Sequence, residues 1–492
     1  MGVPAPTLVT AVRALLLHAR EVYRDRPEAA GWLGHQLRRL DEPLRLAVAG
    51  KVKAGKSTLL NALVGEEIAP TDAGECTRVV TWYEDGHAPR VTLFAHRAPP
   101  RPLRLDRSAG TLRIDLEGTP PEEIERLVVA WPSAQLRETT LIDTPGIASV
   151  SAATSAGTSA FLTPEDSPTA ADAVLYLMRH LHAADLRFLE AFHDRGVARA
   201  APVNTIAVLS RADEIGVGRL DALLSAKRIA ARYRQDESLR GLCQTVVAVA
   251  GLLAHTGRTM RQDEHRALVA LAALPEAELA GLLLSADRFA RPDGPATVPP
   301  DVRRALLERF GLFGLRLGTS LIGRGLADPS RLAAELVKRS GLDDLRRVLA
   351  AQFTERRDLL KARSALLAVE MVLAREPRPA AAPLAAEVER ILAGAHEFAE
   401  LQLLADLRNR TVRLPKDALA EAERLLGADG GAATARLGAE PDTDPAQLRE
   451  IALDALVRWR RRAESPLAGR DVTGAAQVVV RSCEGVLAGL PR

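Results

Sequence analysis

Two patterns of hydrophobic and polar positions divide this 492-residue chain. Between Leu44 and about residue 250, short apolar runs alternate with stretches of helical spacing. After Gly251, apolar residues recur every three or four positions, with Arg and Glu between them. Alternating strands and helices predict an α/β domain, and the second pattern predicts amphipathic helices packed on one another. The strand-like runs cover residues 44–49, 79–83, 90–94, 139–142, 173–178, 204–209 and 245–249.

Helical spacing also covers both ends of the chain. The first 42 residues predict one or two helices, broken around Pro27 and Gly31. The apolar face of the first helix carries Leu8, Val12, Leu15, Leu16 and Val22. The longest helical pattern runs from Leu342 to Leu373 and would span ~48 Å if unbroken, at 1.5 Å per residue. Pro- and Gly-rich joints at 291–300, 376–383 and 427–445 divide the helical half.

Charge and cysteine content exclude several classes of protein. The 66 basic residues are nearly balanced by 63 acidic ones, and a net charge of +3 lacks the excess of a dedicated nucleic-acid binder. The three cysteines, Cys76, Cys243 and Cys483, form no C-x-x-C pair, which excludes a disulfide scaffold and a zinc cluster and fits a reducing cytoplasm. No stretch reaches the ~20 apolar residues that span a bilayer, so integral insertion is excluded and peripheral attachment is not.

The distribution of lysines points to one segment. Only seven of the 66 basic residues are lysines, and three of them fall between Lys51 and Lys56. The run GKVKAGKS at 50–57 matches G-x-x-x-x-G-K-[ST] between a strand and a helix, the context of a phosphate-binding loop. Loop amides and the helix N-terminus attract phosphate, so we expect Lys56 to reach the β- and γ-phosphates and Ser57 to coordinate Mg²⁺. The expected nucleotide contacts in this segment are Gly50, Val52, Lys53, Ala54, Gly55, Lys56, Ser57 and Thr58.

A second motif is LIDTPG at 141–146, which begins in a strand-like run and places Asp143 86 residues after Ser57. We expect Asp143, at the strand end, to hold Mg²⁺ through water, and the amide of Gly146 to sense a γ-phosphate. Asp-Thr-Pro-Gly favours a GTPase over an ATPase, in which the corresponding strand more often ends in Asp-Glu.

The third motif is SRAD at 210–213, again at a strand end. The Asp213 carboxylate can accept two hydrogen bonds from guanine N1 and N2, a pattern that adenine cannot supply. The stem of Arg211 is expected to pack over the base in place of the usual lysine, and Ser210 stands where GTPases typically have Asn or Thr. After the next strand, Ala250 offers a backbone N–H for guanine O6.

Two loops between these motifs are candidate switches. Thr77, in the segment 70–78, is either a solvated loop residue or the group that completes the Mg²⁺ shell and orients the attacking water. The Ser/Thr/Ala-rich stretch 149–170 directly follows the second motif and suits a second switch. Loops that are ordered by a γ-phosphate and released on hydrolysis change the shape of such domains.

With its N-terminal helix and helical second half, this set of motifs resembles the dynamin superfamily. The strings LAVAGKVKAGKSTLLNALVG, ECTRVVTW, LIDTPG and VLSRADEIGVGR are similar, more narrowly, to the actinobacterial isoniazid-inducible dynamin-like GTPases of the IniC type. This implies an α/β P-loop GTPase domain, with a mixed, mostly parallel sheet flanked by helices, and an all-α neck and stalk bundle. The implied division is residues 1–42 as helices of the neck, 43–355 as the GTPase domain with a helical insertion at about 256–330, and 356–492 as neck and stalk.

The resemblance also implies a function. It implies Mg²⁺-dependent GTP hydrolysis coupled to dimerisation of GTPase domains and to movement of the helical arm, in membrane remodelling or maintenance. The expected location is the cytoplasm, with peripheral attachment at the inner face of the plasma membrane. The implied partners are GTP, a second copy, a paralogous dynamin-like protein and an anionic membrane, and the near-neutral charge predicts no nucleic-acid partner. Val52 replaces the glutamine that orients water in dynamins, and Lys53 replaces a serine that helps to bind a charge-compensating monovalent cation. We hypothesise that the Lys53 ammonium supplies this charge. The expected catalytic residues are therefore Lys53 together with Lys56, Ser57 and Thr77. The expected metal ligands are Ser57, Thr77 and Asp143.

Several features of the sequence allow two interpretations each. His180, His182 and His193 are ordinary loop and helix residues or metal ligands, and Cys76 is a chance thiol or a redox-sensitive one. The arginine-rich run 458–462 is a solvated helix face or a contact with anionic lipid, and the apolar segment 271–284 is a core helix or a membrane tip. Two other functions stay open. One is a GTP-gated scaffold of low intrinsic turnover that acts through a paralogous partner, and the other, which the near-neutral charge disfavours, is an RNA-associated GTPase.

Overall fold

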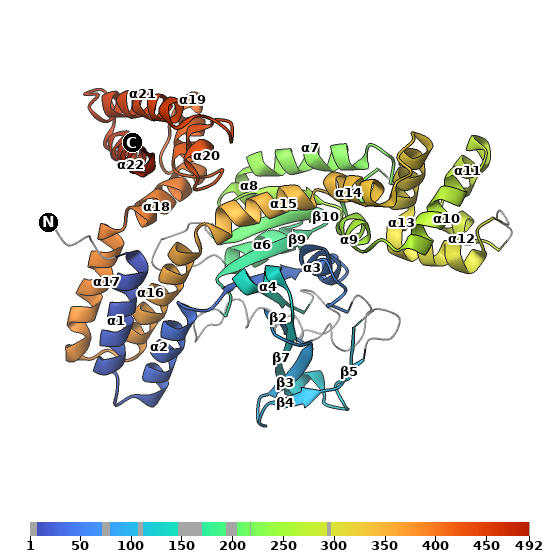
Figure 1. Cartoon of the computed structure of the whole chain (residues 1–492). Coiled ribbons are helices and arrows are strands. Elements are labelled where there is room, and N and C mark those ends of the chain that lie inside the picture. The colour runs from blue at the N-terminus through green and yellow to red at the C-terminus, as the bar shows by residue number, and fades with distance from the viewer. Residues whose placement is uncertain are drawn as a thin grey trace.

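The computed structural model (Figure 1) describes residues 7–70, 79–106, 112–145, 170–192, 204–216, 218–292 and 297–491. Its largest sheet has nine strands in the order β11-β10-β9-β1-β8-β2-β7-β3-β4. The strands are β1 (Leu44–Gly50), β2 (Thr81–Asp85), β3 (Arg90–Ala95), β4 (Arg101–Leu103), β7 (Ile124–Trp131), β8 (Thr139–Asp143), β9 (Ala173–Met178), β10 (Thr205–Ser210) and β11 (Val246–Val249). A second sheet pairs β5 (Leu105–Asp106) with β6 (Arg113–Ile114).

The sheet is mixed and mostly parallel, as the sequence predicted. From β11 to β8 every neighbouring pair is parallel, and β2 pairs antiparallel with β8 but parallel with β7. All residues of β1, β9, β10 and β11 are buried, which explains why these strands read as continuous apolar runs and do not alternate. Because parallel strands end at the same edge, the segments after β1, β8, β9, β10 and β11 meet there.

Helices cover the parallel part of the sheet. They are α3 (Lys56–Val64), α4 (Ala134–Glu138), α6 (Ala183–Phe192), α7 (Ala222–Gln235), α8 (Glu237–Arg240), α9 (Gly251–Thr259) and α15 (Leu342–Leu349). Helix α3 packs on α9, and both α7 and α15 pack on β11. The phosphate-loop helix therefore lies beside the helix that follows the last strand of the sheet.

Between α9 and α15 the chain forms a helical extension on one side of the sheet (Figure 1). It contains α10 (Gln262–Ala272), α11 (Glu276–Leu282), α12 (Ala286–Ala290), α13 (Pro300–Gly323) and α14 (Pro329–Ser340). Gly311 breaks the helical backbone inside α13 with φ of +62°, a value that L side chains rarely adopt. The apolar segment 271–284 is divided between the end of α10 and α11, with Leu271, Leu282 and Leu283 buried and Leu284 exposed.

Four helices from the two ends of the sequence form a bundle. They are α1 (Leu8–Val22), α2 (Pro27–Arg39), α16 (Arg357–Arg375) and α17 (Ala382–Gly394), with α1 packed on the other three. The buried face of α1 contains Val12, Leu15, Leu16 and Ala19. Gly31 lies inside α2, so the break expected around Pro27 and Gly31 falls at residues 23–26 alone. Figure 1 shows the bundle beside one end of the sheet.

The remaining C-terminal helices have a hydrophobic core of their own, centred on the fully buried Trp459. They are α18 (His396–Arg408), α19 (Lys416–Leu425), α20 (Ala433–Leu437), α21 (Pro445–Ala463) and α22 (Arg470–Gly489). Helix α18 joins this group to α17 (Figure 1). Among the helices of the described ranges, none combines the length and the apolar content needed to cross a bilayer.

Two features of the elements were not given by the sequence patterns. The helical pattern from Leu342 to Leu373 is not one unbroken helix, because a π-helical turn at Ala350–Thr354 interrupts it and the α-helix resumes at Arg357. Contacts with a distant loop explain the interruption, because Gln352 donates a hydrogen bond to the carbonyl of Ala428 and Arg356 donates to that of Gly427. Strand β7 was missed, although Leu127, Val129 and Trp131 are buried at alternate positions of an apolar run.

Candidate functional site

The phosphate-loop sequence connects β1 to α3 at the carboxyl edge of the sheet. Gly50 has φ of +147°, and a Cβ there would lie 2.4 Å from the carbonyl oxygen of Leu177 on β9. Gly55, the N-cap of α3, has φ of +90°. Both backbone conformations favour glycine, and they turn the loop so that the first amides of α3, which lack intrahelical acceptors, point out of the helix. An anion-binding helix N-terminus is the result.

Lys56 lies within this turn. Its Nζ donates long hydrogen bonds to the carbonyls of Gly50 (3.3 Å) and Lys51 (3.4 Å). Burial lowers the pKa of Lys56, and the charge of Asp143 opposes that shift. The ammonium group is thus held in the loop by weak contacts that phosphate oxygens can replace.

The structure places Ser57 of the phosphate loop beside Asp143 at the end of β8. The Ser57 hydroxyl donates to Asp143 Oδ2 at 2.9 Å, across 86 residues of sequence. Asp143 Oδ1 is buried and has no hydrogen-bond partner among the described residues. Burial raises the pKa of Asp143, while Lys56 and the Ser57 hydrogen bond act in the opposite direction. A hydroxyl and a carboxylate with one uncompensated oxygen are the hard oxygen donors that suit Mg²⁺, so the residues fit this cation.

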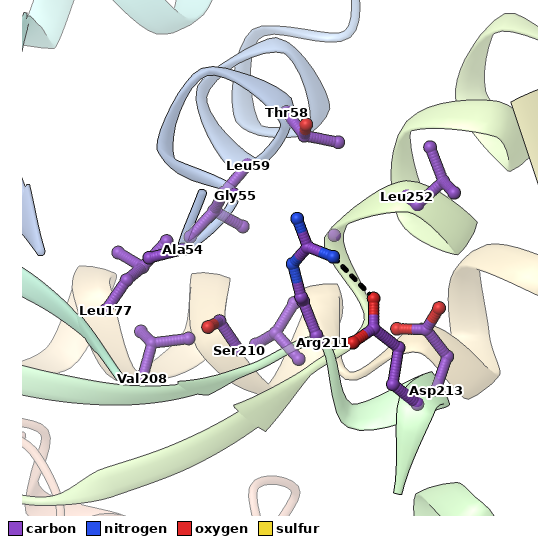
Figure 2. Close-up of a pocket in the computed structure, with 13 residues that line it drawn as sticks. Ala54, Gly55, Thr58, Leu59, Leu177, Val208, Ser210, Arg211, Asp213 and Leu252 are labelled. Atoms are coloured by element: carbon purple, nitrogen blue, oxygen red, sulfur yellow. Dashed lines mark hydrogen bonds and ion pairs between the residues drawn. The ribbon is translucent and has the colours of Figure 1, made fainter. Parts of the chain in front are cut away.

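A pocket opens beside the loop, between β10, α3 and α9. It is lined by Ala54, Gly55, Thr58, Leu59, Leu177, Val208, Ser210, Arg211, Asp213, Glu214, Val249, Gly251 and Leu252. The structure therefore brings the third motif against the phosphate loop. In the view of Figure 2, the Arg211 side chain stands in the middle of the pocket, with Ala54 and Gly55 on one side and Asp213 and Leu252 on the other.

Asp213 is the buried acid of this pocket. Its side-chain atom Oδ1 is buried and has no hydrogen-bond partner among the described residues. Burial, with a smaller contribution from the charge of Glu214, raises the pKa of Asp213 to about 6. A buried carboxylate with an unused acceptor can bind a ligand that presents N–H donors, which then compensate its charge.

The neighbours of Asp213 are held by their own contacts. Arg211 has a left-handed φ of +51° and pairs with Glu214 at 2.6 Å, and Glu214 also pairs with Arg179 at 2.5 Å. The Ser210 hydroxyl donates to the carbonyl of Met178 at 3.2 Å, which ties the end of β10 to the end of β9. Ser210 thus supports the pocket wall by a bond to backbone.

The expectation for Ala250 was wrong. Its N–H donates to the carbonyl of Ser340 at 2.8 Å, and Ala250 is fully buried. This amide therefore does not face the pocket. The first turn of α9 begins one residue later, and the amides of Gly251 and Leu252, which line the pocket, belong to the helical positions that lack intrahelical acceptors.

The remaining residues that the sequence predicted as site residues are either exposed or outside the ranges that the structure describes. Val52 is 48% exposed, and Lys53 is exposed with φ of +61°. Thr77 and Gly146 lie outside the described residues, as do Cys76, His193 and nearly all of the stretch 149–170. His180 and His182 have ring centroids 6.3 Å apart, and the described ranges contain no group of three or more potential ligands around a metal position.

The motifs did not single out Asp185 or Tyr176. Asp185 is buried on α6 and pairs with Lys51 of the phosphate loop at 3.0 Å, and the Tyr176 hydroxyl donates to the same carboxylate. The rarity of lysine in this composition was a signal for Lys51. Nothing in the local sequence distinguishes Asp185 from the other acidic residues on helices.

Comparison with known proteins places these motifs in a family. Residues 46–209 match the family described as the dynamin family. The chain is 44% identical over 486 residues to the isoniazid-induced protein IniC of two strains of Mycobacterium tuberculosis, CDC 1551/Oshkosh and H37Rv, covering 97% of this chain and 98% of each relative. It is also 33% identical over 115 residues to a bacterial dynamin-like protein of Nostoc punctiforme, covering 21% of this chain and 16% of that protein.

Among solved structures, one similar chain belongs to an assembly described as an oligomerised bacterial dynamin pair. It is 14% identical, with a TM-score of 0.31, and the match covers 99% of this chain and 80% of that one. The IniC relatives are similar to this chain over nearly their whole length. The chain therefore belongs to the dynamin superfamily, in the group of the isoniazid-induced IniC proteins.

Proposed function

We propose that this chain binds GTP with Mg²⁺ at the carboxyl edge of its sheet and hydrolyses the terminal phosphate bond. The observation that carries the proposal is the contact between the Ser57 hydroxyl and Asp143. It joins the phosphate loop to the second motif and leaves one buried carboxylate oxygen uncompensated, as a cation site requires. Membership of the dynamin family supports the assignment.

The phosphates would be held by the turn at the start of α3. The loop amides and the helix N-terminus attract the negative charge, and Lys56 exchanges its long bonds to the carbonyls of Gly50 and Lys51 for phosphate oxygens. Phosphoryl transfer depends mostly on positioning and charge stabilisation, so no covalent enzyme intermediate is required.

Ser57 and Asp143 would hold Mg²⁺, Ser57 through its hydroxyl and Asp143 through its carboxylate. When bound, Mg²⁺ neutralises charge on the transferring phosphate. The raised pKa of Asp143 indicates that burial disfavours its ionised form, and a cation beside it would favour that form. Thr77 remains proposed as a further ligand that orients the attacking water, and Gly146 as the amide that senses the γ-phosphate.

Guanine would occupy the pocket between α3, β10 and α9. Asp213 accepts hydrogen bonds from guanine N1–H and N2–H, while the Arg211 stem lies over the base. We assign the donor for guanine O6 to the first turn of α9, in place of Ala250. Adenine presents no matching pair of donors to Asp213, so the pocket would prefer GTP to ATP.

The helical arm would respond to the nucleotide through the junction at the base of the sheet. We propose a GTPase domain over 43–355, and an arm formed by residues 1–42 with 356–492. Arg39 of α2 pairs with the buried Asp172, which also accepts from the backbone N–H of Arg45 at 2.9 Å. The Lys361 ammonium on α16 donates to the carbonyl of Leu40 at 3.1 Å. These contacts connect the start of β9 and β1 with the bundle.

By family membership, we further propose that GTPase domains of two copies associate during turnover. The arm would act in remodelling or maintenance of a membrane, with the protein bound peripherally at the inner face of the plasma membrane. The basic run 458–462 on α21 is the candidate contact with anionic lipid. Two of its charges are already paired, Arg458 with Glu421 and Arg460 with Glu484, which limits the strength of that contact.

A second function, a GTP-gated scaffold with low turnover of its own, is favoured by Val52. This side chain is apolar and 48% exposed at the loop position where dynamins carry the glutamine that orients water. Without a polar group there, hydrolysis would require a contribution from a partner. The partner would be a paralogous dynamin-like chain.

The test of the proposal is nucleotide preference before and after Asp213→Asn. Because hydrogen bonds to a charged group are worth ~1.5–3 kcal/mol, the variant is expected to lose at least tenfold in GTP affinity. XTP carries a C2 carbonyl in place of the amine, so the Asn amide should recover affinity for XTP. Binding is measured by competition against a fluorescent guanine nucleotide, with ATP as the control ligand. Equal competition by ATP and GTP, or unchanged GTP binding by the variant, would refute the proposal.

A further inference from the structure

The phosphate loop has an anchor outside its own motif. Lys51, the second residue of the loop, places its Nζ 3.0 Å from Asp185 Oδ2 on α6. The Asp185 side chain is 1% exposed and that of Lys51 is 33% exposed. A buried carboxylate thus faces the base of the loop, and a lysine reaches into the protein to pair with it.

The carboxylate is fixed from two further directions. The Tyr176 hydroxyl donates to Asp185 Oδ1 at 2.7 Å, and the backbone N–H of His182 donates to Oδ2 at 3.0 Å. Tyr176 lies on β9, opposite Ala49 of β1, and its ring stacks on Phe188 with centroids 5.0 Å apart. Burial raises the pKa of Tyr176, so its phenol remains a donor. Asp185 is therefore held rigidly, since its oxygens have defined partners.

Lys51 connects this anchor to the phosphate-binding groups. Its carbonyl accepts the N–H of Ala54 at 3.1 Å and the Nζ of Lys56 at 3.4 Å. The same turn requires a left-handed φ of +61° at Lys53, which costs an L residue ~1–2 kcal/mol. A backbone conformation with such a cost persists only where surrounding contacts determine it.

We propose that Asp185, oriented by Tyr176, is a positioning residue that holds the phosphate loop in its nucleotide-binding shape through Lys51. This inference rests on the proposed function of the same site. The pair acts on the loop conformation and leaves the reacting groups untouched. When the pair is broken, the fraction of loops in the binding shape falls, and apparent Kd rises by the inverse of that fraction. The loss is therefore equal for GDP and GTP, and turnover at saturating GTP is retained.

The experiment is a double-mutant cycle on nucleotide affinity. Lys51→Met, Asp185→Asn and the double variant are titrated with fluorescent GDP and with a non-hydrolysable GTP analogue, in the full chain. Each single variant is expected to raise both Kd values by about tenfold, and the double variant to be no weaker than the weaker single one. Lys51→Arg keeps the charge and should restore most of the affinity.

The control is a second lysine–aspartate pair of the same length. Lys227 and Asp344 also lie 3.0 Å apart, but both are more exposed, and neither lines the nucleotide pocket. Lys227→Met should leave both Kd values unchanged. If Asp185→Asn fails to fold, Lys51→Met and Tyr176→Phe carry the test, because Lys51 is partly exposed and the Tyr176 change removes only a hydroxyl.

The outcomes separate this inference from the proposed function. A wild-type chain that binds no guanine nucleotide refutes the proposed function and this inference with it. Wild-type binding together with unchanged Kd values for Lys51→Met overturns the inference alone. Additive losses in the double variant, or a loss of turnover at saturating GTP with unchanged Kd, would also overturn it, because either result means that the two residues act separately or on the chemical step.

Discussion

Replacing Asp213 by Asn is expected to stabilise the nucleotide-free protein while lowering its affinity for guanine nucleotides. The side chain is buried, and Oδ1 has no partner among the described residues, so at neutral pH the folded state holds an uncompensated negative charge. The pKa of Asp213 rises from a usual value of 3.8 to about 6. At about 1.4 kcal/mol per pKa unit, ionisation costs the folded state about 3 kcal/mol.

The sign of the pH dependence follows from this raised pKa. Below about pH 4 the carboxyl is protonated in the folded and the unfolded state, and the charge costs nothing. Above about pH 4 the unfolded chain gives up this proton while the folded protein keeps it, so the wild type loses stability relative to the variant until the pH has passed the folded-state pKa of about 6. The stability advantage of Asp213→Asn should therefore be largest above pH 7 and vanish near pH 4.

Thermal unfolding of protein stripped of nucleotide measures this difference at several pH values. For domains of 150–250 residues, 1 kcal/mol shifts Tm by ~2–4 °C, so we expect an increase of roughly 5 °C for this larger domain at pH 7.5. Saturating GDP should narrow the difference, because ligand at a hundred times the wild-type Kd adds about 2.7 kcal/mol to the wild type and less to the variant, which binds guanine nucleotide more weakly. Asp442→Asn, on an exposed loop, is the matched control. A variant that is no more stable than wild type at pH 7.5, or a stability advantage that does not change with pH, would show that the Asp213 charge does not destabilise the folded protein.

Two further predictions concern the phosphate end of the site. Lys53→Ala should slow GTP turnover more than it weakens GTP binding. The exposed Lys53 makes no ion pair within the described residues and is proposed to supply charge to the transition state. Turnover equal to that of wild type in single-cycle kinetics would rule that role out. Ser57→Ala should raise the Mg²⁺ concentration for half-maximal turnover about tenfold, because it removes one oxygen donor to the cation. Nucleotide binding without Mg²⁺ should stay within about twofold of the wild-type value, because the loop amides remain in place. An unchanged Mg²⁺ titration would contradict the assignment of Ser57 as a ligand.

Much of this site could be predicted from sequence because its parts are local. The phosphate loop, the strand ending in Asp143 and the strand ending in Ser210 each have a motif within a few residues, and parallel strands bring their ends to one edge. The seven expected strands are all present, since buried parallel strands read as continuous apolar runs.

What the sequence did not reveal depends on contacts between distant residues. The amide of Ala250 is occupied by Ser340, and the long C-terminal helix is interrupted where Arg356 meets Gly427. Asp185 is one of 63 acidic residues in the sequence, and only the folded structure shows that it pairs with Lys51. Local periodicity contains no information about such partners.

The most direct test of the account is GTP turnover per molecule as a function of protein concentration, with Mg²⁺ and without lipid. We expect release of phosphate from GTP and none from ATP, with a specific rate that rises with protein concentration as GTPase domains associate. Ser57→Ala and Asp213→Asn should abolish most of the activity at physiological Mg²⁺ and limiting GTP. A flat rate near zero, in a chain that binds GTP tightly, would contradict hydrolysis by this chain alone and favour the scaffold that depends on a partner.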